Sequence, residues 1–291
     1  MKEPVRNIRD ELYKDIGYDA LWRLPNAGFV FRLGAVYVFL DPVMSSPHPF
    51  YADMRQQANE AGELPFFREE LKHYDPASVF NEVHDVPLRA EEVEKADHVL
   101  ITHEHEDHLD ADALGVIGKL NPTVLAPRSC HPPILGAGIA PRSVVEAVHG
   151  ERHEYEGFSV EVVPANHTNS VAAAVSPDAC GYLLRTKHGN IFLMGDGRFD
   201  HEDKATITGL DVDYLLVPIN DTNLGVGFAA LLTHLLQPRV VVPVHYGYTF
   251  PPVRSQGGHP AEFVTALAAR NYSLPTTDIV ILQPGGRLVL A

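Results

Sequence analysis

The histidine-rich stretch at residues 102–110, with the sequence THEHEDHLD, constrains the fold of this chain more than any other feature. The apolar run HVLI at 98–101 precedes it and is typical of a buried strand. Apolar residues at helical spacing follow over 109–120 and predict a helix. The histidines and acidic residues between these two elements are therefore expected on a strand-to-helix turn.

The residue types on this turn suit a metal ion. In an extended segment alternate side chains point the same way, so His103 and His105 can bind one ion. Asp107 and His108 follow where the chain begins to coil, and they are directed at a neighbouring point. Imidazole and carboxylate together suit Zn or Mn, and a His-rich set with open positions suits a catalytic metal. A solvated acidic loop that happens to carry histidines is the alternative that this motif alone leaves open.

Length and charge limit the classes of partner. At 291 residues the chain is long enough for a substantial core, and we expect a single domain over 1–291. The formal net charge is −15, without a cluster of Lys or Arg, which argues against nucleic acid or an anionic membrane as the main partner. A small-molecule substrate fits, and it can be anionic because a bound dication dominates the local field.

The compartment is predicted from cysteine usage and from hydropathy. The two cysteines, Cys130 and Cys180, do not make a disulfide framework, and they fit a reducing compartment. Residues 1–18 are charged and lack the apolar core of a signal peptide. No run approaches the roughly 20 apolar residues that a membrane-spanning helix needs. The sequence therefore predicts a cytoplasmic enzyme.

Several predicted strands end in a residue that can bind a metal. The strands and the residues that follow them are 98–101 with His103 and His105, 158–164 with His167, 190–194 with Asp196, 214–218 with Asn220 and Asp221, and 240–244 with His245. Layered β-rich folds place ligands on loops beyond strand ends. Taken singly, His167 could be a loop histidine, Asp196 a turn residue between glycines, and His245 a core histidine. Their shared placement favours a metal centre.

Two features lie upstream of the motif. A predicted β-hairpin over 27–40 ends at Asp41-Pro42, where Asp41 is either a turn residue or an acceptor that orients a ligand histidine from behind. Prolines then punctuate short helical pieces over 44–88, which we interpret as a helical insertion near the active site. This insertion could cover the site or form a subunit contact, so a homo-oligomer is left open.

The chain resembles the metallo-β-lactamase superfamily. Its ligand pattern is matched by His103-x-His105-x-Asp107-His108, His167, Asp196 and His245. Within the superfamily it is most similar to the L-ascorbate-6-phosphate lactonase-like branch. That similarity rests on Asp41-Pro42, the Pro-rich insertion, Ala126-Pro127 with Cys130, Met194-Gly195-Asp196 and the sequence VPVH at 242–245. In one departure, Asn26 and Ala27 occupy the hairpin position before Gly28 that often carries a histidine in such families.

The resemblance implies an αββα four-layer sandwich with the metal site at one edge. It implies that His103, His105 and His167 hold one ion, that Asp107, His108 and His245 hold a second, and that Asp196 bridges them. Some members of the branch work with a single ion, so we expect one or two ions of Zn or Mn per chain.

The predicted chemistry is hydrolysis of a cyclic ester, such as a sugar lactone with or without a phosphate, by a metal-bound hydroxide. A bound dication lowers the pKa of water from 15.7 to about 7. Asp107 is the predicted catalytic residue, which orients the water and passes its proton to the leaving alkoxide. Arg128 is the candidate for binding a substrate phosphate, or else it is a surface arginine, and Asn220, Asp221 and Tyr246 are further candidate substrate contacts. The alternatives are a phosphodiesterase of the same fold and a metal-binding scaffold without catalysis.

Overall fold

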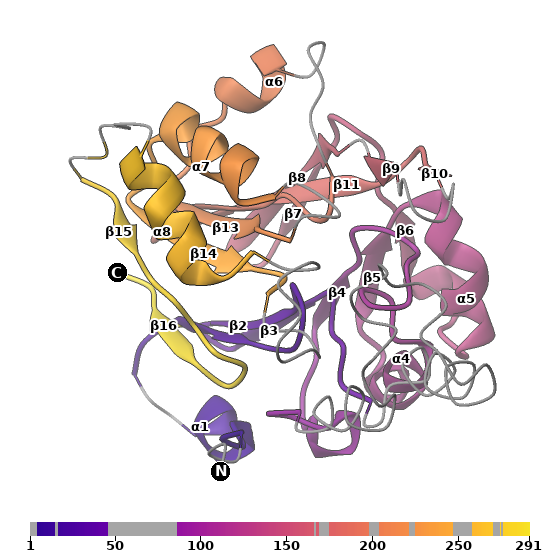
Figure 1. Ribbon diagram of the computed structural model, residues 1–291. Helices are drawn as coiled ribbons and strands as arrows, with labels where there is room; N and C mark the ends of the chain where they lie inside the picture. The colour runs from indigo at the N-terminus through magenta and orange to yellow at the C-terminus, as the bar shows by residue number, and fades with distance from the viewer. Residues whose placement is uncertain are drawn as a thin grey trace, which may run out of the picture.

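The computed structural model describes residues 5–14, 17–45, 86–165, 167–168, 175–197, 204–220, 225–246, 258–269, 274 and 276–291 (Figure 1). Within these residues the chain forms two seven-stranded sheets. The first sheet has the order β16-β1-β2-β3-β4-β5-β6, and the second has the order β15-β14-β13-β12-β11-β8-β7. A short antiparallel pair, β9 (His167–Thr168) with β10 (Val175–Ser176), stands apart from both.

The first sheet is antiparallel on one side and parallel on the other. Its strands are β16 (Arg287–Val289), β1 (Ala20–Arg23), β2 (Phe29–Leu33), β3 (Val36–Leu40), β4 (His98–Leu100), β5 (Thr123–Ala126) and β6 (Val144–Glu146). From β16 to β3 the neighbours are antiparallel, and from β3 to β6 they are parallel. The carboxyl ends of β3 and β4 therefore meet at one edge of the sheet.

The second sheet repeats this mixture. Its strands are β15 (Asp278–Ile279), β14 (Val240–Val244), β13 (Tyr214–Pro218), β12 (Gly189–Leu193), β11 (Cys180–Thr186), β8 (Phe158–Pro164) and β7 (Arg152–Tyr155). Strands β12 to β15 are parallel neighbours, whereas β7, β8, β11 and β12 are antiparallel. The parallel strands β12, β13 and β14 thus end at a common edge.

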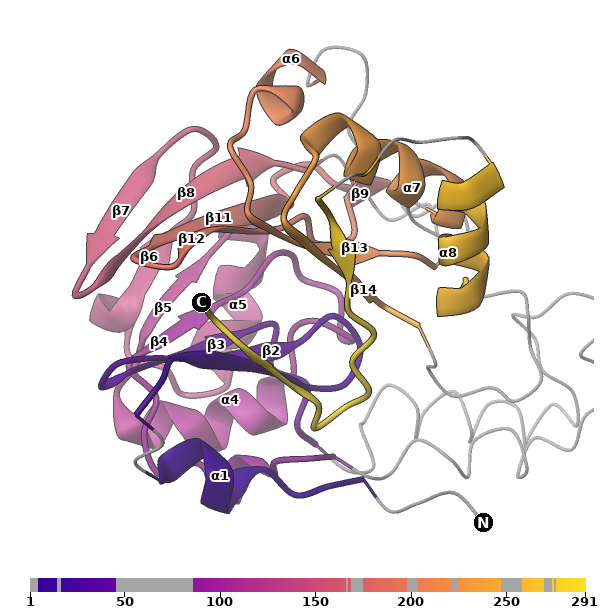
Figure 2. The ribbon, with the colours of Figure 1, turned by 90° about the vertical axis from the view of Figure 1, so that its left-hand side faces the viewer.

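Helices cover the outer face of each sheet. Outside the first sheet lie α1 (Arg9–Tyr13), α4 (Ala111–Ile117) and α5 (His131–Gly136). Outside the second lie α6 (Lys204–Thr208), α7 (Gly225–Leu236) and α8 (Pro260–Ala269). In Figure 2 the two sheets lie one above the other, with α1 and α4 below them and α6 and α7 above. None of the described helices is long and apolar enough to cross a bilayer.

Alternation along the strands explains the layers, because successive side chains of a strand point to opposite faces. Phe29 of β2 belongs to the apolar cluster between the sheets, together with Tyr182 of β11. The next residue, Val30, packs in the cluster that includes Leu114 of α4. On the other side, Leu183 of β11 shares a cluster with Leu232 of α7. The predicted αββα sandwich is confirmed.

The predicted elements match the structure closely where the sequence pattern is strong. The strands predicted at 158–164, 214–218 and 240–244 are β8, β13 and β14. The helix predicted over 109–120 is α4 followed by a 3-10 turn at Gly118–Leu120. The hairpin predicted over 27–40 is β2 and β3. Most of the predicted insertion at 44–88 lies outside the described residues, which resume at 86.

Candidate metal centre

The loop between β4 and α4 is held at both ends. At its start, the Ile101 amide donates to the Leu125 carbonyl at 3.0 Å and so extends the sheet ladder. In its middle, the amides of His108 and Leu109 donate to the His105 carbonyl and form a turn. At its end, Asp110 caps α4 by accepting a hydrogen bond from the Ala113 amide. A main-chain hydrogen bond therefore fixes the first end of the loop, and the side-chain cap of Asp110 fixes the second.

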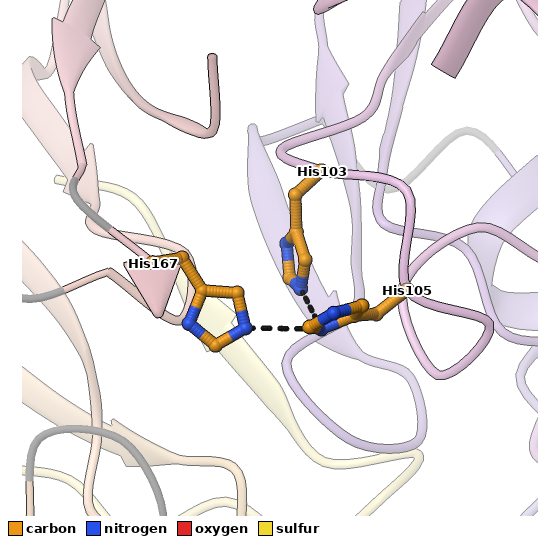
Figure 3. A group of neighbouring side chains, drawn as sticks. All are labelled: His103, His105 and His167. Atoms are coloured by element: carbon orange, nitrogen blue, oxygen red, sulfur yellow. Dashed lines mark hydrogen bonds between the residues drawn. The ribbon is translucent and has the colours of Figure 1, made fainter. Parts of the chain in front are cut away.

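Three histidines form a first cluster, His103 and His105 from this loop and His167 from β9 (Figure 3). His105 Nδ1 lies 3.1 Å from His103 Nε2 and 2.9 Å from His167 Nε2. One nitrogen of each ring thus points at a common centre. His103 and His167 are buried, and His105 is half-buried.

The rings of His103 and His167 are neutral at neutral pH. Burial lowers the pKa of His167 to about 4 and the pKa of His103 well below its ordinary value. His103 Nδ1 lies 3.0 Å from Thr102 Oγ1, and that hydroxyl donates to Asp41 Oδ2 at 2.7 Å. Because the hydroxyl hydrogen is used for Asp41, Thr102 Oγ1 accepts from His103 Nδ1–H. The lone pair of His103 is therefore on Nε2, which faces the cluster.

Two carboxylates and two histidines form a second cluster: Asp107, His108, Asp196 and His245. Asp196 Oδ2 lies 3.2 Å from His108 Nε2 and 3.0 Å from His245 Nε2. Asp107 Oδ2 lies 3.5 Å from His245 Nε2. The side chain of His108 is fully buried, whereas that of Asp107 is 25% exposed. Asp107 is therefore the member of this cluster that solvent reaches most readily.

Opposite charges shift the titration of the second cluster. Burial opposes the charged form of His245, but the carboxylates of Asp196 and Asp107 outweigh it and raise its pKa to about 9. The same balance raises the pKa of His108 well above its usual range. Burial likewise opposes ionisation of Asp107 and Asp196, but the charges of His108 and His245 hold both carboxyl pKa values below their ordinary range. Without an ion, protons on the imidazoles supply the positive charge here.

Elements from both sheets place these ligands. Asp196 follows β12 in a turn where Gly195 has a φ of +63°, which favours glycine. His245 follows β14, and its own φ of 56° turns the chain back at that point. His103 and His108, from the other half of the molecule, have ring centroids only 4.2 Å apart. The two clusters are therefore adjacent across the junction of the sheets.

The donor atoms fit a divalent metal. Within each cluster the ligand atoms all lie within 4.8 Å of one another. Asp196 Oδ1 is buried and has no hydrogen-bond partner among the described residues, an arrangement that a bound cation would satisfy. Imidazole nitrogen and carboxylate oxygen are the ligand types that protein Zn and Mn sites use.

The sequence profile of the "Beta-lactamase superfamily domain" matches residues 23–245, which span this entire constellation. The chain belongs to the metallo-β-lactamase superfamily. A UPF0173 metal-dependent hydrolase from Methanobrevibacter smithii is 32% identical over 198 residues, covering 65% of this chain and 77% of the relative. The chain is accordingly a metal-dependent hydrolase of this superfamily. The lactonase-like branch is not distinguished by these relatives.

Solved structures show the same fold. A novel metallo hydrolase from Ignicoccus hospitalis, Igni18, aligns with a TM-score of 0.62 at 20% identity, covering 93% of this chain and 97% of that one. A possible metal-dependent hydrolase from Veillonella parvula aligns with a TM-score of 0.67 at 14% identity, covering 94% and 100%. At such identities the likeness concerns the superfamily fold alone.

Asp41 lies behind both clusters of this superfamily site. Its side chain is fully buried, and Oδ2 lies 2.8 Å from His108 Nδ1 as well as 2.7 Å from Thr102 Oγ1. Its Oδ1 accepts from the Thr102 amide at 2.8 Å. Of the two roles that the sequence left open, the contacts are those of an acceptor that orients His108 directly and His103 through a hydroxyl.

Two residues at the site were not predicted to act there. Asn26, noted only as a departure from the family pattern, places its Nδ2 2.7 Å from the Asp107 carbonyl oxygen. Arg23 is fully buried, and its Nη2 donates to the carbonyls of Asn26 and Tyr246. An isolated arginine at the end of a short apolar strand carries no sequence signal for this position. The Asn26 contact depends on a turn that the sequence does not specify.

The candidate substrate contacts have different placements. Arg128 is exposed at the start of the 3-10 turn Arg128–Cys130, directly after β5. Asn220 is buried at the end of β13, and Asp221 lies outside the described residues. Tyr246 is buried, its hydroxyl donates to the Leu282 carbonyl at 2.7 Å, and Arg23 stacks on its ring at 4.1 Å. In this structure the Tyr246 ring thus packs against Arg23 and does not face solvent.

Proposed function

We propose that this protein is a lactonase that uses Zn or Mn to hydrolyse a cyclic ester of a sugar acid. The observation that carries the proposal is the position of Asp107. It belongs to the second ligand cluster, yet its side chain is 25% exposed, while the neighbouring His108 is fully buried. A carboxylate can act on substrate and water only where both can reach it.

The chain's own groups divide the work. When bound, a divalent ion supplies an electrophile for a carbonyl oxygen and acidifies water to a pKa of about 7. Asp107 is anionic in the metal-free protein, because the charges of His108 and His245 outweigh burial and lower its pKa, and a bound cation would favour the same anionic form, so the carboxylate can accept a hydrogen bond from water and orient it. We assign to the same carboxylate the transfer of that proton to the leaving alkoxide of the opened lactone.

Substrate contacts are proposed at the rim. Arg128 is exposed beside the loop of Ser129, whose Oγ donates to Glu104 of the histidine motif at 2.9 Å. A guanidinium in this position would pair with a phosphate or carboxylate on the sugar. Asn220, which is buried after β13, and Asp221, which lies outside the described residues, are also proposed as contacts to sugar hydroxyls.

The test of the reaction class is a substrate panel. Elemental analysis of the purified protein identifies the bound metal, and metal-free protein is then reloaded separately with Zn²⁺ and Mn²⁺. We expect hydrolysis of sugar lactones, followed by acid release at constant pH. Turnover of bis-p-nitrophenyl phosphate without turnover of lactones would establish the phosphodiesterase instead. A protein that binds either ion but turns over nothing on the panel would be the non-catalytic scaffold.

The role of Arg128 is tested with matched variants. Arg128→Ala should raise the KM for phosphorylated lactones about tenfold and leave the KM for unphosphorylated ones unchanged, because about 1.4 kcal/mol is a typical loss for one charged contact. Arg142, also exposed in a 3-10 turn, provides the control, and Arg142→Ala should change neither constant. An equal effect of Arg128→Ala on both substrates would refute a phosphate-binding role.

A further inference from the structure

Asn26 is a buried residue with an unusual backbone at the turn between β1 and β2. Its φ is 57°, in the left-handed region that asparagine tolerates better than most residues. It has no solvent exposure. Its amide nitrogen lies 2.7 Å from the main-chain oxygen of Asp107, 3.2 Å from Asp107 Oδ2 and 3.2 Å from His108 Nε2. The amide nitrogen of the side chain therefore contacts two members of the second ligand cluster.

The Asp107 carbonyl fixes the orientation of this amide. A carbonyl oxygen can only accept a hydrogen bond, so the nitrogen of Asn26, and not its oxygen, must face Asp107. The second N–H of the same group is then available to the Asp107 carboxylate. A hydrogen bond to an ionised carboxylate is shorter and stronger than one between neutral groups. Asn26 thus holds both the backbone and the carboxylate of Asp107.

The backbone of Asn26 reaches the opposite half of the site. Its carbonyl oxygen lies 3.3 Å from the His245 amide nitrogen and accepts that hydrogen bond. The same oxygen accepts from Arg23 Nη2 at 3.3 Å. Asp107 belongs to the loop after β4 and His245 to the loop after β14, so one residue connects ligands carried by the two sheets.

We propose that Asn26 is a positioning residue that sets the affinity of the second cluster for its ion, through Asp107 and His245. The inference rests on the proposed metal centre. His245 Nε2 also lies near the Asp107 carboxylate, at 3.5 Å, and as a ligand atom it would turn to the ion when one is bound. The hydrogen bond from Asn26 would then continue to fix the carboxylate in the loaded site.

The experiment is a titration of metal-free protein with Zn²⁺ alone and with Mn²⁺ alone, against a competing chelator. Asn26→Gly keeps the left-handed backbone accessible and removes the amide. We expect the wild type to bind two ions, and the variant to bind one of them about 10- to 100-fold more weakly, as for other groups that orient ligands. The weakened ion should be the one lost in His245→Ala, and the ion lost in His167→Ala should be unaffected.

A matched control separates backbone effects from the amide. Asn121 has a φ of 58° at the exposed end of a 3-10 turn, so Asn121→Gly makes the same chemical change away from the site. It should leave both affinities unchanged. Asn26→Ala is the second variant: it removes the same amide but keeps a Cβ, and it should weaken the same ion to the same extent even if its melting temperature differs from that of Asn26→Gly.

Two outcomes would overturn the inference. In the first, the wild type binds two ions and Asn26→Gly weakens neither, or weakens both equally. In the second, the wild type binds a single ion that His167→Ala removes and His245→Ala does not, so the second cluster holds none. If such a one-ion protein hydrolyses lactones, the proposed lactonase function is supported and the proposed role of Asn26 is refuted. If the wild type binds two ions, Asn26→Gly weakens the expected one and no lactone is hydrolysed, the role of Asn26 is supported and the lactonase function is refuted.

Discussion

His108 Nδ1 lies 2.8 Å from Asp41 Oδ2, and both side chains are fully buried. The contact joins the end of the hairpin β2–β3 to the loop after β4, and β3 and β4 are parallel neighbours in the first sheet. Because Nδ1 donates to Asp41, Nε2 of the same ring is the nitrogen that can bind an ion in the second cluster. Asp41 also accepts from Thr102 Oγ1, which in turn accepts from His103 Nδ1. One carboxylate therefore sets the ring orientation of a histidine in each cluster.

Asp41→Asn should weaken metal binding at both clusters. An amide oxygen can still accept from His108 or Thr102, but the amide nitrogen replaces an acceptor with a donor, and the charge is lost. We expect affinities lower by about 10- to 100-fold, measured by chelator competition. Asp97→Asn is the control, because Asp97 also accepts a backbone hydrogen bond, from Tyr37 at 2.8 Å, but away from the metal centre. Unchanged affinities in Asp41→Asn would exclude an orienting role.

Asp107→Asn should reduce turnover more than it reduces metal content. The amide preserves size and an oxygen ligand atom, but it cannot take up a proton at neutral pH. Loss of a general base typically costs about 100- to 10,000-fold in kcat. Elemental analysis and steady-state kinetics on the same sample separate the two effects. Asp112→Asn, an exposed carboxylate in the first turn of α4, should leave kcat unchanged. Near-normal turnover in Asp107→Asn would remove that carboxylate from the reaction.

The ligand positions could be predicted because they follow a general property of sheets. Parallel neighbours end at the same edge, so residues after β12 and β14 meet there without any knowledge of the loops. The common edge does not determine which way each side chain beyond a strand end points. Tyr246 directly follows His245, but the left-handed φ of 56° at His245 turns the chain, and the tyrosine ring packs under Arg23.

Other parts of the fold depend on contacts between distant segments. Strand β1 is completely buried and contains Arg23, so it lacks the alternation that marks a strand. Its partner β16 lies at the opposite end of the sequence, with Ala20 opposite Val289. The Asn26–Asp107 contact likewise joins residues 81 positions apart. No local pattern encodes such pairs, because they form only when distant segments of the chain have assembled into the first sheet.

Gly28→Ala should destabilise the turn that carries Asn26. An added Cβ would lie 2.6 Å from the main-chain oxygen of Asp41 and 3.0 Å from that of Pro25, and neither backbone atom can move freely. We expect a loss of about 1–3 kcal/mol in the free energy of unfolding of the metal-free protein, measured with urea. Gly136→Ala is the control, since a Cβ there meets nothing within 4 Å. Equal stability of the two variants would show that the Asp41 loop yields to the methyl group.

The stability of the metal-free protein should fall as pH rises above about 6.5. The carboxylates of Asp196 and Asp107 outweigh burial and raise the pKa of His245 to about 9, and they also raise the pKa of His108 well above its usual range. A group whose pKa is higher in the folded state stabilises fully below the unfolded pKa, and this contribution is lost as pH rises through the folded pKa.

Between pH 6.5 and 9, the folded state therefore keeps protons that the unfolded state has released. His245 should lower the free energy of unfolding by about 1.4 kcal/mol per pH unit in that window, and His108, whose pKa is shifted in the same direction, should steepen the slope. Metal ions displace these protons, so loaded protein should show a flatter profile and an affinity that rises with pH. Urea unfolding from pH 6 to 10, with chelator and with Zn²⁺, measures both slopes. In metal-free protein, His245→Gln should reduce the dependence of the free energy of unfolding on pH by the contribution of one proton. An unchanged dependence in that variant would contradict the assignment of His245 as a protonated ring in the metal-free state.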